Sequence, residues 1–102
     1  MRRTISPDEL AKQSAEITVI DVRRKAEYDG DTILNAKWHD PEKVTEWARE
    51  LPDSKEIVLY CARGGSVSNK VLDHLLSQNI KARYIEGGIE AWKKGGGEVT
   101  RR

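Results

Sequence analysis

The only cysteine of this 102-residue chain lies in a glycine-containing stretch between two regular segments, in the sequence CARGGS. Cys61 follows the apolar run 57–60 and precedes a helical pattern that begins at Val67. A cysteine that serves packing alone is expected within the strand or the helix, and not at the bend between them. The position therefore favours a reactive thiol outside the core over an incidental cysteine in an ordinary strand–turn–helix connection.

The residues that follow the cysteine are suited to holding an anion. Gly64 and Gly65 allow backbone angles that turn successive N–H groups toward one point. Ser66 is expected to cap the following helix, whose first N–H groups and positive dipole end face the same point. A helix N-terminus and a neighbouring cation, here Arg63, lower the pKa of a cysteine thiol from about 8.5 to roughly 3.5–7.5. The loop therefore predicts a thiolate nucleophile near neutral pH.

Strands and helices alternate along the rest of the sequence. Apolar runs predict strands at 17–22, 57–60 and 82–85, and 33–38 is a weaker strand candidate. Start signals such as a polar cap followed by proline predict helices that begin at Ser6, Asp40, Val67 and Ile89. Stop signals place the ends of these helices before Ser14, Pro52, Asn79 and Gly95, and 24–28 is a candidate for one helical turn. The alternation predicts an α/β fold, a mostly parallel sheet with helices on both faces.

An open parallel sheet binds ligands outside the carboxyl ends of its strands. Four segments are expected to leave the sheet at that edge, namely 21–23, 38–40, the Cys61 loop and 86–88. The thiol is therefore expected in the crevice where such folds carry function.

Composition limits the classes of partner. The chain has 18 Lys and Arg against 17 Asp and Glu, a net charge of +1, which argues against nucleic acid or a membrane surface as the main partner. The basic start has no apolar stretch behind it, so no signal peptide is expected. Neither His39 nor His74 has the spacing with Cys61 of a metal site. These observations predict one cytoplasmic domain, 1–102, without metal or cofactor.

Three sequence stretches form a specific signal when they are taken together, in this order and at this spacing: DVR at 21–23 with EY at 27–28, YCARGGS at 60–66, and EGGIEAW at 86–92. With these stretches the chain resembles the rhodanese family of single-domain sulfurtransferases over about residues 17–92. The resemblance implies a single rhodanese-like domain.

The resemblance also implies a mechanism. Cys61 attacks the outer sulfur of a donor such as thiosulfate, releases sulfite and becomes a persulfide. The sulfur then passes to an acceptor such as cyanide, a thiol or a protein. Arg63 is the implied contact for the anionic donor, and Asp21 and Arg23 are expected to brace the neighbouring loops. The substrate cradle is implied to be the backbone of Ala62, Arg63, Gly64, Gly65, Ser66 and Val67.

Departures from the family pattern fall beside the expected site. Where many members read Gly-His-Ile-x-Gly-Ala, residues 31–36 keep only the isoleucine and the alanine, and the segment 37–40 that follows is unusual. The pocket wall is therefore expected to differ from that of other members. His39 in this segment is either a substrate contact or a solvated loop residue.

Rival functions use related loops. A phosphatase or arsenate reductase would need an arginine at Val67, to complete Cys-x5-Arg, and a thioredoxin-like role would need a second cysteine. The remaining alternative is a rhodanese-like module that carries sulfur for, or binds, a protein partner and has little activity with free thiosulfate.

Overall fold

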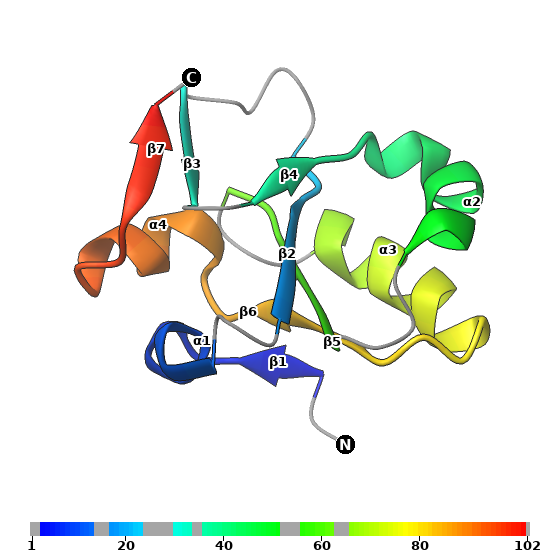
Figure 1. Ribbon diagram of the computed structural model, residues 1–102, viewed down its shortest axis with the longest axis horizontal. Coiled ribbons are helices and arrows are strands. Elements are labelled where there is room, and N and C mark those ends of the chain that lie inside the picture. The colour runs from blue at the N-terminus through cyan, green and yellow to red at the C-terminus, as the bar shows by residue number, and fades with distance from the viewer. Residues whose placement is uncertain are drawn as a thin grey trace.

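The computed structural model describes residues 3–13, 17–23, 30–33, 36–51, 56–62 and 66–101. In these segments a five-stranded parallel sheet has the order β1-β6-β5-β2-β4, and β3 and β7 form a separate antiparallel pair (Figure 1). The strands are β1 (Thr4–Ile5), β2 (Ile17–Asp21), β3 (Asp31–Ile33), β4 (Lys37–Trp38), β5 (Glu56–Tyr60), β6 (Ala82–Ile85) and β7 (Val99–Arg101).

Helices cover both faces of the sheet, as the sequence predicted: α1 and α4 lie on one side and α2 and α3 on the other (Figure 1). None of the described helices is long and apolar enough to cross a membrane. The helices are α1 (Pro7–Gln13), α2 (Val44–Trp47), α3 (Ser66–Ser77) and α4 (Gly88–Lys94), with short 3-10 turns η3 (Pro41–Lys43) and η4 (Ala48–Glu50) flanking α2.

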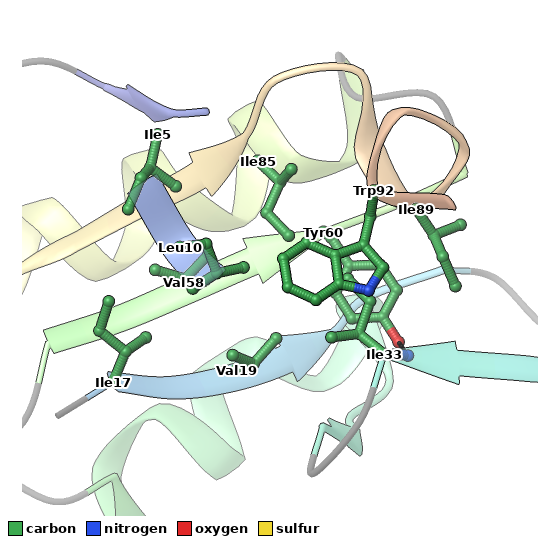
Figure 2. Close-up of a cluster of buried hydrophobic side chains, with 10 residues drawn as sticks. All are labelled: Ile5, Leu10, Ile17, Val19, Ile33, Val58, Tyr60, Ile85, Ile89 and Trp92. Carbon is green, nitrogen blue, oxygen red and sulfur yellow. Dashed lines mark hydrogen bonds between the residues drawn. The ribbon is translucent and has the colours of Figure 1, made fainter. Parts of the chain in front are cut away.

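Each helical layer packs on its own apolar cluster. Along β5, Val58 and Tyr60 face one layer whereas Ile57 and Leu59 face the other, because successive residues of a strand point to opposite faces. The α1/α4-side cluster (Figure 2) consists of Ile5, Leu10, Ile17, Val19, Ile33, Val58, Tyr60, Ile85, Ile89 and Trp92. The α2/α3-side cluster consists of Ile20, Val22, Trp47, Ala48, Ile57, Leu59, Val71, Leu72, Leu75 and Ala82. A strand buried on both faces must be apolar throughout, which explains the continuous apolar run before the cysteine.

The predicted helix signals are confirmed by their hydrogen bonds. Glu9 N donates to Ser6 Oγ at 3.2 Å at the start of α1, and Glu42 N donates to Asp40 Oδ1 at 2.9 Å at the start of η3. Asn79, just after α3, has φ 62°, the left-handed conformation expected of it. The candidate helical turn at 24–28 and the stop signal Pro52 lie outside the described residues.

The prediction of one strand at 33–38 was wrong. Ala36 N donates to Ile33 O at 2.9 Å, a hydrogen bond that a continuous strand does not contain. Ile33 belongs to β3, which pairs with β7, whereas β4 pairs with β2. Strands β1 and β7 were not predicted. They contain two and three residues, too few to show a period, and they become strands through their partners.

Candidate active site

The segments expected at the carboxyl edge of the sheet do meet there, since β6, β5, β2 and β4 are consecutive neighbours in the sheet. Tyr60, Asp21 and Trp38 are level with one another across β5, β2 and β4. The ladder continues one residue further, because Val22 N donates to Tyr60 O at 2.9 Å and His39 N donates to Asp21 O at 3.0 Å. Consequently, Cys61 and the first residues after β2 and β4 lie side by side at this edge.

Cys61 is buried, with 5% of its surface exposed, although the sequence placed it outside the core. The first turn of α4 accounts for its fixed position. Ile89 N donates to Cys61 O at 3.0 Å, and Glu90 N donates to Ala62 O at 3.2 Å. The backbone of the cysteine segment is therefore anchored by amides that lie far away in sequence. No sequence signal identified these amides as part of the site.

The glycine pair at the start of α4 allows this anchoring. Gly87 has φ 74° and Gly88 has φ 63°, left-handed conformations that side chains disfavour. They turn the chain from β6 directly into α4, so that the first amides of the helix point at the carbonyls of Cys61 and Ala62. This geometry gives a structural reason for the glycine pair in EGGIEAW.

Replacing Gly87 by alanine is expected to weaken both the fold and the site. The new Cβ would lie 2.6 Å from the Ala91 Cβ, in a backbone conformation that is already unfavourable for alanine. We expect Gly87→Ala to lower the free energy of unfolding by about 1–3 kcal/mol in urea denaturation. Gly96→Ala is the matched control, because Gly96 has φ +81° but nothing within 4 Å of the new Cβ. Equal losses of unfolding free energy in the two variants would show that the close contact with the Ala91 Cβ does not affect stability.

Helix α3 begins five residues after Cys61, at Ser66. Its positive dipole end therefore follows the cysteine closely in the chain. Val67 is half-buried against the α2/α3-side cluster, and Ala62 is half-buried. Arg63, Gly64, Gly65 and the side chain of Ser66 lie outside the described residues, so their expected roles stay predictions.

Asp21 and Arg23 form a fully buried ion pair beside the cysteine strand. Arg23 Nη2 lies 2.8 Å from Asp21 Oδ2, and both side chains are 0% exposed. The guanidinium also donates from Nη2 to Asp31 O at 2.6 Å, and the Arg23 carbonyl accepts a bond from Trp38 Nε1 at 2.7 Å. The pair thus joins the ends of β2, β3 and β4. The bracing role expected of Asp21 and Arg23 stays a prediction, which the substitution of Arg23 in the Discussion tests.

Tyr60, the residue before the cysteine, belongs to the same polar group. The Arg23 guanidinium lies 5.5 Å from the centroid of the Tyr60 ring. The Tyr60 hydroxyl accepts a hydrogen bond from the Ile33 N–H at 3.2 Å (Figure 2). Burial and the nearby Asp21 carboxylate raise the pKa of Tyr60 above its ordinary value of 10, so the phenol keeps its proton. Sequence reasoning missed this residue. The available signal was a tyrosine at the end of a doubly buried strand, where its hydroxyl needs a partner.

His39 does not extend freely into solvent. It is half-buried, and its ring stacks on that of Trp47 with centroids 4.9 Å apart and planes 21° apart. The Trp47 indole is itself fixed, because Nε1 donates to Asp40 O at 2.7 Å. Burial first, and then the charge of Lys37, lower the pKa of His39 below 6.5, against an opposite effect of Glu50. The imidazole is therefore neutral at neutral pH.

Metal ligation has no visible basis in the segments that the structure describes, where no three His, Cys, Asp or Glu side chains form a suitable group. The chemistry available to the site is that of a thiol at the carboxyl end of β5, five residues before the start of α3 and on a strand next to a buried ion pair.

A family model, a related sequence and solved structures agree on the kind of protein that this chain resembles. The sequence model described as the rhodanese-like domain matches residues 6–95 of the chain. The chain is 35% identical over 86 residues to the thiosulfate sulfurtransferase GlpE of Coxiella burnetii, which covers 83% of this chain and 78% of that protein. A rhodanese-related protein from Thermoplasma volcanium superposes with a TM-score of 0.87 at 26% identity, covering 97% of this chain and 98% of the other. A rhodanese-like domain protein from Staphylococcus aureus gives 0.79 at 29% identity, covering 97% and 99%.

Proposed function

The chain belongs to the rhodanese-like domain family, and from that premise we propose that it is a sulfurtransferase that works through a persulfide on Cys61. The sulfur comes from thiosulfate or an organic persulfide and passes to a thiophilic acceptor. The observation that carries the proposal is the position of Cys61 at the carboxyl end of β5, fixed by α4 and followed at once by the segment that leads into α3. Similarity to a thiosulfate sulfurtransferase favours an enzyme over a module that only binds a partner.

In the first half-reaction the Cys61 thiolate attacks the outer sulfur of thiosulfate. A new S–S bond forms, the S–S bond of the donor breaks, and sulfite leaves with the electron pair. The products, a persulfide anion and sulfite, together carry the same three negative charges as the reactants. In the second half-reaction cyanide attacks the outer sulfur, leaves as thiocyanate and restores the thiolate.

The proposed cycle passes through two anions, the Cys61 thiolate and the Cys61 persulfide, and the site has features that stabilise negative charge. The positive dipole end of a helix stabilises a nearby negative charge, and α3 begins soon after the cysteine. Since Cys61 is only 5% exposed, little water screens that interaction. The anchored carbonyls of Cys61 and Ala62 keep the backbone from shifting while the sulfur is loaded and discharged.

Steady-state kinetics with thiosulfate and cyanide test this function. A covalent intermediate between two half-reactions predicts ping-pong behaviour, with parallel lines in double-reciprocal plots at several fixed cyanide concentrations. Thiocyanate formation no faster than in the absence of protein would leave the binding module as the better description. Converging lines would show that transfer occurs without the persulfide.

Arg63 is the only cation of the CARGGS stretch, and we propose that it contacts the anionic donor. Charge-assisted hydrogen bonds contribute roughly 1.5–3 kcal/mol in a shielded site. We therefore expect Arg63→Ala to lower kcat/KM for thiosulfate by about tenfold to a hundredfold. The loss should become smaller as salt is added, because salt screens the attraction that only the wild type has.

The matched control for Arg63→Ala is Arg49→Ala, since Arg49 is an exposed arginine on η4. It should leave kcat/KM within about twofold of the wild type, as expected for an exposed charge. Equal effects of the two substitutions would mean that donor binding responds only to the net charge of the protein.

A further inference from the structure

His39 lies near Cys61 at the edge of the sheet, with only Val22 between them. The three residues follow β4, β5 and β2, and the backbone hydrogen bonds described above keep them level with one another. Neighbouring strands lie about 4.8 Å apart, so the backbones of His39 and Cys61 are separated by about 10 Å.

The same three side chains belong to one face of the sheet. Tyr60 packs in the α1/α4-side cluster, so strand alternation assigns the next residue, Cys61, to the face of α2 and α3. Val22 packs in the α2/α3-side cluster, and His39 stacks on Trp47 of α2. By this alternation His39 lies on the same face of the sheet edge as the thiol, on the side away from α4.

The stacked rings, of which the His39 imidazole is neutral, give this part of the sheet edge an aromatic surface. Trp47 is 6% exposed whereas His39 is half-buried, so the accessible part of the pair belongs mainly to His39. Thiosulfate and cyanide are small inorganic anions that gain little from such a surface. A molecule with a carbon skeleton, by contrast, gains both apolar and stacking contact there.

We propose that His39, backed by Trp47, is a specificity-determining residue that contacts the carbon skeleton of an organic thiol while that thiol accepts sulfur from Cys61. The inference rests on the proposed function and adds a residue that selects among its acceptors. A tripeptide thiol such as glutathione is long enough to span the about 10 Å that separates the backbones of Cys61 and His39. Cyanide, with two atoms, is too short.

The transfer step balances without an oxidant or a reductant. The acceptor thiolate RS⁻ attacks the outer sulfur of the Cys61 persulfide anion, Sγ–S⁻, and forms a new S–S bond. The S–S bond to Cys61 breaks, and its electron pair remains on Cys61 as the thiolate. The acceptor leaves as the persulfide anion RS–S⁻, so the two negative charges are conserved. The reverse of this step loads Cys61 from an organic persulfide, so the same contact serves a donor of that class.

Discharge of a preformed persulfide isolates this step. The protein is loaded with thiosulfate, separated from excess donor, and discharged with glutathione or cyanide over a range of concentrations. We expect His39→Ala to lower the ratio of the glutathione rate to the cyanide rate by roughly threefold to tenfold, the effect of losing one ring contact. The change should appear as a higher glutathione concentration at half-maximal rate. His39→Phe, which keeps a ring, should retain the wild-type ratio within about twofold.

Lys43→Ala, an exposed substitution on η3, is the control and should keep the ratio. If His39→Ala does not fold, His39→Gln removes the ring and keeps a side chain of similar length. Equal effects on both acceptors, or a ratio in His39→Phe as low as in His39→Ala, would overturn the inference. Failure of the wild type to form any persulfide would instead refute the proposed function, and the inference with it.

Discussion

Cys61→Ser is expected to reduce thiosulfate:cyanide sulfur transfer to the background rate. Serine has nearly the same size as cysteine, but its oxygen cannot form or hold a persulfide, so neither half-reaction can proceed. Because Cys61 is buried, the new hydroxyl is expected to cost about 1–3 kcal/mol of unfolding free energy if it finds no partner. That cost is smaller than the roughly 5–15 kcal/mol of a typical domain, so the variant should remain folded.

Cys61→Ala serves as the control for this result, because it replaces the thiol by an apolar group and avoids a buried hydroxyl. Both variants should be folded by circular dichroism and inactive in the thiocyanate assay. Substantial activity in either variant would show that another group carries the sulfur. Since Cys61 is the only cysteine of the chain, that outcome would contradict the persulfide mechanism itself.

The second large effect is expected on stability, from Arg23→Met. This substitution leaves the Asp21 carboxylate buried without its partner, and it removes the donor to the Asp31 carbonyl. Removing one member of a buried ion pair typically costs about 3–5 kcal/mol. For a domain of this size the melting temperature should fall by about 20 °C, which thermal unfolding measures directly. A loss below about 1 kcal/mol would show that the pair does not brace the sheet edge.

An exposed ion pair with the same N···O distance provides the control. Arg3 Nη2 lies 2.8 Å from Asp73 Oδ1, the same separation as in the buried pair, but the side chains are 43% and 68% exposed. Arg3→Met should therefore cost less than about 1 kcal/mol. The double variant Asp21→Asn/Arg23→Met, in which no charge is left buried, should be more stable than Arg23→Met alone.

The local parts of the fold could be predicted because local physics determines them. The apolar run that ends at Tyr60 and the amphipathic pattern after Val67 each correspond to an observed element, β5 and α3. The proline-containing starts of α1 and η3 are visible in a few neighbouring residues. The position of the cysteine at the carboxyl edge then follows from the alternation of strands and helices.

Other parts of the site depend on strand order, which a single sequence does not show. The amides of Ile89 and Glu90 reach the cysteine segment only because β6 lies beside β5. In the same way, His39 meets Trp47 because η3 turns the chain back over the sheet after β4, and neither residue type alone predicts that stack. The separation of β3 from β4 was missed because it depends on β7, whose three residues carry no periodic signal.

Intact-protein mass spectrometry after incubation with thiosulfate tests the central claim most directly. The wild type should gain the mass of one sulfur atom, lose it again when cyanide is added, and release thiocyanate in equal amount. Cys61→Ser should gain nothing under the same conditions. If the wild type shows no added sulfur with thiosulfate or with glutathione persulfide, the assignment of Cys61 as a sulfur carrier is contradicted.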